Sequence, residues 1–165
     1  MLRAEYIAGF FDGEGSVGLY ASRSSKRHAL RVCINQVVNP ASQALFDDLK
    51  ATFGGGLSYP KRQKTHHNPA VSWSVYGDEA ATFLRWILPH LLLKKEQVEL
   101  VVGWQEKYTG NRKRQRSPER RLEREQDALV VSSKLGPLKG PRKKNHECIF
   151  DRDGSFSCGC GKTAV

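Results

Sequence analysis

The chain has 165 residues, which is enough for one ordinary hydrophobic core and too few for two full domains. Its formal net charge is +10, which indicates a polyanionic partner, because lysine and arginine gain affinity by displacing counterions from phosphates. Nucleic acid is the leading candidate for that partner, and an anionic membrane surface is the alternative.

Two features of the sequence bear on where the protein acts. No apolar run reaches the roughly 18 residues that span a bilayer, and the first residues lack the pattern of a secretory signal. Three of the four cysteines lie near the C-terminus, which does not match a disulfide framework spread over a secreted fold. We expect a soluble protein with no membrane partner, in the cytoplasm if prokaryotic or phage-encoded, or in an organelle matrix if organelle-encoded.

The first expected elements are a short helix and a pair of strands. Apolar residues recur at helical spacing over residues 2–11, and this pattern stops in the glycine-containing segment 12–15. Residues 16–23 and 29–38 alternate between apolar and polar side chains, which predicts two strands joined by a polar loop.

A second helix and a second pair of strands follow. Asn39 is a suitable N-cap with Pro40 at the first helical position, and the glycines at 54–56 end the helix. Residues 57–61 and 70–76 are the next predicted strands, and a basic loop containing histidine joins them.

Two amphipathic helices are then expected over residues 78–90 and 92–108, divided at Pro89. The order helix, two strands, helix, two strands, two helices predicts an α+β domain over residues 1–109, with an antiparallel sheet covered by helices. The expected core residues of the last two helices are Phe83, Trp86, Ile87, Val98, Val101 and Val102.

The composition changes after Gly110, where few apolar residues are available to bury. Fourteen basic and seven acidic residues lie there, against 13 and 10 before it, so the tail carries most of the excess charge. We expect residues 110–145 to form a basic linker with a charged helix over 117–131, and residues 146–165 to form a separate segment.

That last segment contains four residues of the kinds that bind structural zinc. His146 and Cys148 are followed by Cys158 and Cys160, which gives the four ligands that a structural Zn²⁺ site requires. The Cys-Gly-Cys spacing is tight for two tetrahedral ligands. A hairpin around residues 151–154 with reduced thiols is therefore the alternative interpretation.

The N-terminal helix carries a more specific pattern. Gly9 and Gly13 are four residues apart, so they share one helix face and leave no side chain there to hold a second backbone away. The whole segment from Tyr6 to Ser16, YIAGFFDGEGS, resembles the signature of the LAGLIDADG homing endonuclease family, and it runs into a strand as the family's does. The resemblance covers residues 3–109.

The resemblance implies a homodimer, because the chain carries one motif and an active site needs two. The family's dimer interface corresponds to Ala8, Gly9, Asp12 and Gly13 here. Glu14 matches the catalytic acid and a metal ligand, and the carbonyl of Gly13 matches a backbone metal ligand. Paired carboxylates from two copies would favour Mg²⁺ or another divalent cation.

The family often has aspartate where this chain has Glu14, which lengthens the side chain by one methylene. Asp12 matches a residue with mainly a structural role, accepting backbone hydrogen bonds at the helix end. For an isolated string of four residues, 12–15, a polar turn that merely closes a helix would be the preferred interpretation.

Two further catalytic candidates follow from the resemblance. Gln36, at the end of the second strand, lies where many relatives carry a polar residue that organises solvent at the scissile phosphate. Lys94 lies where the family has a lysine near the active-site water, with Lys95 as the alternative. Each of these residues also fits an ordinary solvated position, at a strand end or a helix start.

The two hairpins would form a sheet with one open face, suited to a DNA major groove. Arg31 could donate two hydrogen bonds to guanine, and Cys33 could contact a thymine methyl group. Charged residues of the loops are more suited to phosphates than to base edges. The candidate DNA contacts are Tyr20, Ser22, Arg23, Lys26, Arg27, Arg31, Cys33, Tyr59, Lys61, Arg62, Ser72 and Ser74.

The sequence therefore predicts a homodimeric endonuclease that cuts a long, nearly palindromic double-stranded DNA site, with a role in intron or intein mobility. Two alternatives keep the fold and change the activity. One is a non-cleaving DNA-binding regulator, which the presence of Glu14 argues against. The other is a maturase that binds its host intron RNA, which the sequence barely distinguishes from the nuclease.

Overall fold

The structure is a computed structural model that describes residues 2–21, 27–60, 68–109 and 117–139, and the backbone of 148–150 and 156–158. Its elements are α1 (Ala4–Glu14), β1 (Gly15–Ala21), β2 (His28–Val37), α2 (Pro40–Phe53), β3 (Gly56–Ser58), β4 (Ala70–Tyr76), α3 (Gly77–Ile87), the 3₁₀ turn η1 (Leu88–His90), α4 (Lys95–Tyr108), α5 (Pro118–Leu138), β5 (Cys148–Phe150) and β6 (Phe156–Cys158).

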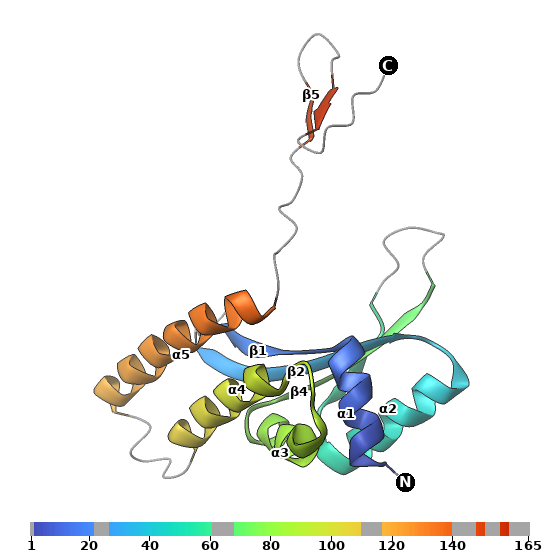
Figure 1. Ribbon diagram of the computed structural model, residues 1–165, viewed down its shortest axis with the longest axis horizontal. Helices are drawn as coiled ribbons and strands as arrows, with labels where there is room; N and C mark the ends of the chain where they lie inside the picture. Colours follow the sequence, from blue (N-terminus) through green and yellow to red (C-terminus); the bar gives the residue numbers. More distant parts are fainter. Residues whose placement is uncertain are drawn as a thin grey trace. The chain divides into compact units, whose positions relative to one another are not determined.

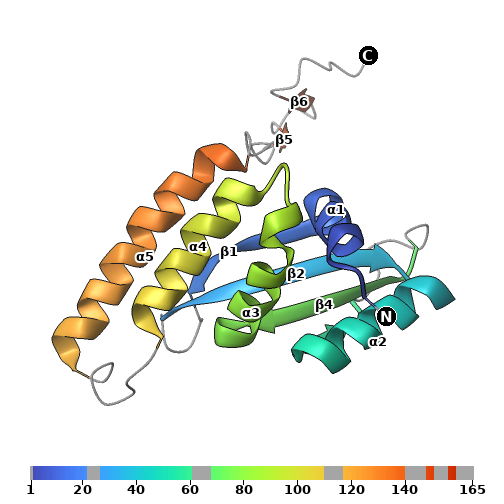
Figure 2. The same cartoon turned by 60° about the horizontal axis from the view of Figure 1, so that its bottom comes forward.

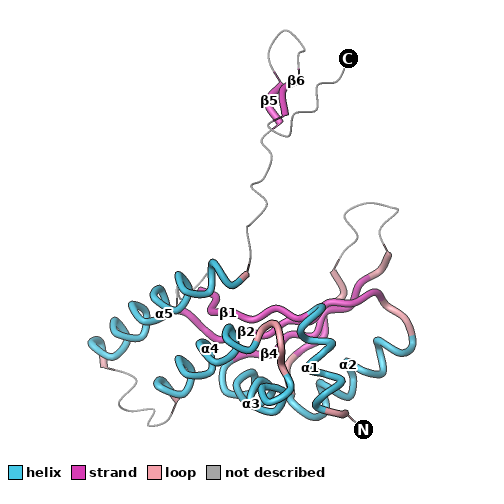
Figure 3. The backbone as a smooth tube through the Cα atoms, viewed as in Figure 1, coloured by secondary structure: helices cyan, strands magenta, loops and turns pink. Residues whose placement is uncertain are grey.

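A four-stranded sheet organises the first part of the chain. Its strands lie in the order β1-β2-β4-β3, and every neighbouring pair is antiparallel. Helices α1 to α4 lie on one face of this sheet, and none of these four covers the other face (Figures 1 and 2). Figure 3 shows the same separation, with the magenta strands of this sheet on one side and helices α1 to α4 in cyan on the other. The α+β fold with an antiparallel sheet is confirmed.

The hydrophobic core lies between the sheet and these helices. Val32, Ile34 and Trp73 alternate with outward-facing residues along β2 and β4, and each is fully buried. The Phe83 ring of α3 packs edge-on against Trp73, with ring centroids 5.0 Å apart. Five of the six predicted helix core residues are buried, and Trp86 is half-buried.

Local chemistry sets the ends of α2 as the sequence predicts. The side chain of Asn39 accepts a hydrogen bond from the Ser42 amide at 2.8 Å, and the Ser42 hydroxyl accepts one from the Asn39 amide at 3.0 Å. Gly54 and Gly55 then adopt φ angles of 75° and 78°, a left-handed conformation that glycine tolerates best. The reversal they make leads the chain directly into β3.

The first compact unit extends to Leu135 and so includes most of α5, beyond the boundary at residue 109 that composition indicates. α5 buries few apolar side chains, among them Ala128 and Leu135. A basic residue contributes to the contact as well, because the Arg124 guanidinium lies 4.8 Å from the centre of the Trp104 ring of α4. Stacking of this kind is not visible in an apolar pattern, so the sequence predicts a charged helix over residues 117–131 but not that this helix docks on α4.

The second unit comprises Gly136–Val165. Its described strands, β5 and β6, pair antiparallel, with Cys148 opposite Cys158 in the ladder. His146 and Cys160 lie outside the described residues, so the zinc site stays a prediction.

None of the helices in the described part of the chain combines the length and apolar character needed to cross a membrane.

Candidate active site and nucleic-acid interface

α1 has one buried side and one open side at its C-terminal half. Glu14 is the last residue of the helix and is exposed. Gly9 and Gly13 are exposed too, and a Cβ atom built on either would meet nothing within 4 Å. The predicted open glycine face is therefore present. Ala8 does not belong to it, since its side chain is fully buried within the single chain.

The Asp12 carboxylate accepts hydrogen bonds within its own chain, while its place in a dimer interface stays a prediction. It accepts hydrogen bonds from the amides of Leu92 and Lys94, at 2.8 and 2.9 Å, and from that of Leu93 at 3.1 Å. Burial raises the pKa of Asp12, but the amides and the charge of Lys94 outweigh it, so the pKa lies below its usual value. The structural role implied by the resemblance fits this geometry, and it fixes the segment before α4 to the end of α1.

Lys94 reaches the end of α1 from that segment. Its ammonium donates to the carbonyl of Phe11 at 3.1 Å and to that of Asp12. Burial lowers the pKa of Lys94, while the negative charges of Asp12 and Glu14 oppose this shift. The alternative lysine, Lys95, is exposed at the start of α4. The structure thus places Lys94 beside the catalytic candidate Glu14.

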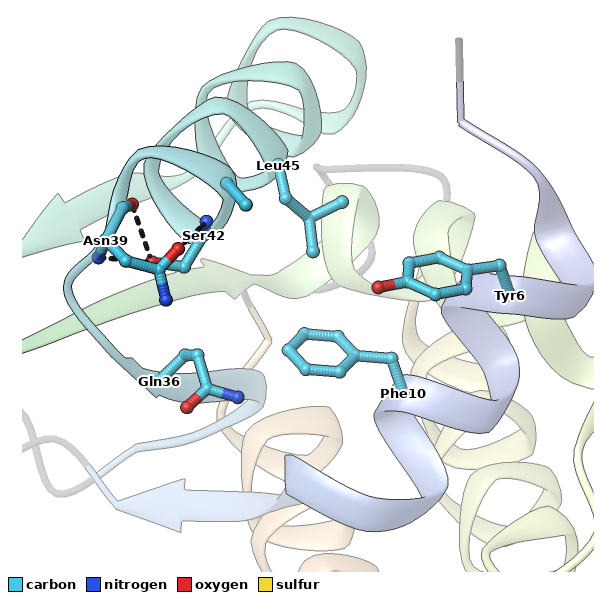
Figure 4. A pocket seen from close by; sticks show the side chains of 7 residues that line it. Tyr6, Phe10, Gln36, Asn39, Ser42 and Leu45 are labelled. Carbon is cyan, nitrogen blue, oxygen red and sulfur yellow. Dashed lines mark hydrogen bonds between the residues drawn. The ribbon is translucent and has the colours of Figure 1, made fainter.

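Gln36 lines a hollow of about 390 Å³ between the end of β2, α1 and the start of α2. Figure 4 shows its side chain on the same side of the hollow as Asn39, with the rings of Phe10 and Tyr6 on the opposite side. Its Oε1 atom accepts a hydrogen bond from the Val37 amide at 2.8 Å. Within the described ranges no hydrogen bond joins Gln36 to Glu14 or Lys94, so the structure does not bring the three candidates into one contact.

Within the described residues, the end of α1 offers few side-chain ligands for a catalytic cation. Among the described residues, no cluster of three or more His, Cys, Asp or Glu side chains could hold a metal ion. The end of α1 presents one exposed carboxylate, Glu14, next to the Gly13 backbone. Mg²⁺ prefers oxygen ligands of this kind, so the donors fit in chemistry but not in number unless a second copy adds its own.

Large apolar side chains surround the open side of α1. Tyr6 is 62% exposed, and Leu92 and Leu93, next to the Asp12 carboxylate, are 87% and 78% exposed. Exposed apolar groups gathered around a side-chain-free helix face are typical of a surface that another chain covers.

The outer face of the sheet presents polar and aromatic side chains. Arg31, in β2, lies opposite Tyr76 of β4, and Tyr20 projects from β1 on the other side. Tyr20 and Tyr76 are 44% and 52% exposed. Tyr76 and the exposed Asn35 also lie on this face but are not among the predicted contacts, although continuing the alternation of each strand by one more step would have found them.

Two predicted base contacts on this face are covered. Cys33 and Ser72 are only 8% and 5% exposed, and the Cys33 sulfur lies 3.1 Å from the Ser72 hydroxyl. Because the Cys33 and Ser72 side chains contact each other and are almost buried, they are not positioned to contact a base. Ser74 is half-buried, and its hydroxyl accepts a hydrogen bond from Arg31 at 3.4 Å.

Two of the remaining candidate contacts are among the described residues. Arg27 is exposed next to β2, and the exposed Tyr59 donates a hydrogen bond to the Gln43 side chain at 2.9 Å. The others lie outside the described residues, and these are Ser22, Arg23, Lys26, Lys61 and Arg62.

This fold is shared with solved structures of homing endonucleases. I-CvuI bound to its Sro1.3 target with calcium is 21% identical, with 86% of this chain and 85% of that chain covered at a TM-score of 0.63. The archaeal intron-encoded I-Vdi141I in complex with DNA is 17% identical, with 86% and 88% covered at a TM-score of 0.56. The LAGLIDADG homing endonuclease I-GzeII with its DNA target is 19% identical, with 80% of this chain but 44% of that chain covered, at 0.56. No family model and no curated protein matches the sequence.

Proposed function

We propose that this protein, whose fold is that of the LAGLIDADG homing endonucleases, cuts both strands of a specific DNA site as a homodimer. The observation that carries the proposal is the placement of Glu14. It is an exposed carboxylate at the end of α1, beside the open glycine face and next to the tethered Lys94. A helix end of this kind completes an active site when a second copy packs against it.

The homodimer is supported by the surface of α1. Two copies that meet through Gly9 and Gly13 can approach closely, since no side chain separates their backbones. The exposed Tyr6, Leu92 and Leu93 would be covered in the same contact. The match to I-GzeII spans less than half of that longer chain, which leaves room there for a second copy of the fold.

A divalent cation is expected between the paired helix ends. Glu14 and the Gly13 carbonyl of each copy would hold it, and Mg²⁺ is our candidate because the donors are hard oxygens. When bound, it would supply charge to activate water and to stabilise the leaving oxygen of the phosphodiester. Without a second copy, the single Glu14 carboxylate of one chain would bind the cation weakly.

Lys94 adds a fixed positive charge at this place. Its ammonium has three donor hydrogens, and two carbonyls of α1 orient it. The remaining donor is available to a water molecule or to a phosphate oxygen of the DNA. Because the ammonium is tethered, we assign to Lys94 the orientation of the attacking water and not the binding of the cation.

The experiment that tests the proposal is a cleavage selection from a library of random duplex DNA, with and without Mg²⁺. The wild-type protein should enrich cut molecules with one nearly palindromic sequence. Glu14→Gln should slow cutting of that sequence by at least about 100-fold, since even residues that only support metal ligands cost about 10- to 100-fold. Its binding should change little, because the sheet face is intact.

Glu119→Gln is the matched control, since Glu119 is an exposed acid of α5. It should cut like the wild type. Undiminished cutting by Glu14→Gln would show that another group supplies the acid. A protein that binds a sequence but never cuts it would be a regulator, and one that selects only RNA would be a maturase.

Sedimentation of the complex with the selected DNA tests the pairing separately. Two protein chains per site are expected. Gly13→Leu should reduce the dimer and cleavage together, because a large side chain would hold the two helices apart. An active complex with one chain per site would contradict the shared active site.

A further inference from the structure

We infer that Arg31 reads a guanine in each half of the DNA target, and that Tyr20 and Tyr76 hold its guanidinium in the orientation that this needs. The inference rests on the proposed function, because it names the base that the open sheet face recognises. Three features of the described residues carry it: the place of Arg31 in the sheet, the two rings that flank it, and its few hydrogen bonds.

Arg31 lies on an inner strand of the sheet, at the last pair of the β2–β4 ladder. β2 has a neighbour on each side, β1 and β4, and Arg31 pairs with Gly18 in one and Tyr76 in the other. Side chains in the middle of a sheet laid in the major groove face base edges, while loops and strand ends flank the phosphates. The position of Arg31 therefore favours a base contact over a phosphate contact.

Two aromatic rings flank the guanidinium of Arg31. Its central carbon lies 5.5 Å from the centre of the Tyr20 ring and 5.7 Å from that of Tyr76. The two tyrosines come from the strands on opposite sides of β2, so the arginine is restrained from both directions. A planar guanidinium that stacks uses its flat faces and leaves its N–H edge available for hydrogen bonds.

Within the part of the chain that the structure describes, Arg31 makes few hydrogen bonds. A guanidinium has five N–H donors, and here one bond, to the Ser74 hydroxyl, is 3.4 Å long. The buried Nε atom has no hydrogen-bond partner within the described residues. By contrast, Arg85 and Arg120 form ion pairs with Glu106 and Glu123. Arg31 is thus restrained in position, and within the described residues no carboxylate forms an ion pair with it.

Guanine is the base whose major-groove edge fits such a group. Its O6 and N7 atoms are adjacent acceptors that match two parallel N–H donors. Adenine places an amino donor beside N7, and cytosine presents an amino donor, so both would set a donor against the arginine. Thymine offers one acceptor next to a methyl group. A restrained guanidinium should therefore discriminate sharply at one base pair.

The test is a binding selection from random duplex DNA with the Glu14→Gln protein, in which cutting is removed. We expect a guanine at one position of each half-site. Arg31→Lys in the same background should lower the preference at that position by about 10- to 100-fold, since lysine keeps the charge and loses the paired donors. Preferences at all other positions should be retained.

Tyr20 and Tyr76 are positioning residues, so the effect of their variants is measured as the guanine preference at that same position of the half-site. Tyr76→Phe and Tyr20→Phe keep the rings and should keep the guanine preference. Tyr76→Ser should relax it, because the guanidinium loses one of its two restraints. Thermal unfolding of each variant checks that the sheet remains folded.

The outcomes separate this inference from the proposed function. If the parent protein selects a sequence and Arg31→Lys selects the same one with equal strength, the assignment of Arg31 is wrong and the nuclease proposal stands. Affinity that falls equally for every sequence would show that Arg31 contacts phosphate, which also overturns the inference. A parent protein that selects no sequence overturns both.

Discussion

Two carboxylates each tie a distant segment to a helix, and they do so by different physical means. Asp12 of α1 is almost buried and accepts three backbone amides from the segment before α4. Glu125 of α5 is 30% exposed, and it accepts the His28 amide at 3.2 Å while lying 2.5 Å from the His28 ring nitrogen. The Asp12 contact lies at the candidate active site, and the Glu125 contact lies at the start of β2.

The surroundings of the two carboxylates differ in the same way. The donors to Asp12 are neutral amides at the edge of an apolar core, with the tethered Lys94 nearby. Glu125 belongs to a group of charged residues in which Arg124 stacks on Trp104 of α4. Salt screens exposed charges and leaves buried hydrogen bonds almost unaffected. We therefore expect the segment held by Asp12 to be rigid and the contact of α5 with β2 to be released more easily.

The largest effect is expected when the Asp12 tie is broken. Asp12→Ala leaves three amides without their acceptor, and we expect the free energy of unfolding to fall by about 3 kcal/mol. The Lys94 ammonium should also lose its fixed place, so cleavage should decrease beyond what the loss of folded protein explains. Urea denaturation and a cleavage assay below the unfolding midpoint measure the two effects separately.

Asp47→Ala is the control for that variant, since Asp47 is an exposed acid of α2 and should change stability little. Equal losses of unfolding free energy in the two variants would show that the amide contacts of Asp12 do not stabilise the fold. The loss should also be independent of salt, because the donors are neutral and the carboxylate is buried.

The lowered pKa of Asp12 adds a prediction about pH. A carboxyl group whose pKa is depressed on folding stabilises the protein above its unfolded value, near 3.8, and loses this contribution as the pH falls through its folded value. Asp12→Asn should therefore differ most from the wild type near neutral pH, and the gap should narrow below about pH 4. A gap that widens on acidification would contradict the direction of this pKa shift.

A smaller effect is expected when α5 is loosened. Arg124→Ala removes the stacking on Trp104 and a hydrogen bond to the His28 carbonyl, and we expect a loss of about 1 kcal/mol. Hydrogen exchange of the α5 amides should quicken while that of α1 and α4 is retained. Exchange that quickens in all three helices alike would show that α5 is part of one cooperative core.

The Arg124 result should depend on salt where the Asp12 result does not. Raising the NaCl concentration from about 0.05 to about 0.5 M should speed exchange of the wild-type α5 and narrow its difference from Arg124→Ala. Arg121→Ala is a matched control, because Arg121 is an exposed arginine of the same helix.

How far the sequence predicts these regions follows from the kind of pattern each one leaves. α1, the capped α2 and the alternating strands depend on spacing that repeats within a few residues, so their faces and ends are visible directly. The open glycine face is such a case, since Gly9 and Gly13 share it by helical geometry alone. Glu14 is likewise located by its neighbours in the chain.

The remaining features depend on partners far apart in the sequence. Asp12 is tied to residues about eighty positions away, which no local pattern indicates. Cys33 follows the strand alternation and so counts as outward-facing, yet its contact with Ser72 of another strand leaves it covered. The docking of α5 is not visible in the sequence because its contacts are made by a guanidinium and carboxylates. In a composition-based prediction such charged groups are expected to be solvated.

The smallest effect is expected from the His28 contact itself. Glu125→Gln keeps an acceptor for the His28 amide and removes the negative charge beside the ring, so we expect a loss below about 1 kcal/mol. The change should appear locally, as faster hydrogen exchange at the start of β2, with α4 unaffected. Glu119→Gln on the same helix should show neither effect. Because β2 carries Arg31, a loosened start of the strand should also weaken DNA sequence preference slightly at the outermost positions of the site. Equal weakening at every position would contradict a local role of Glu125 at the start of β2.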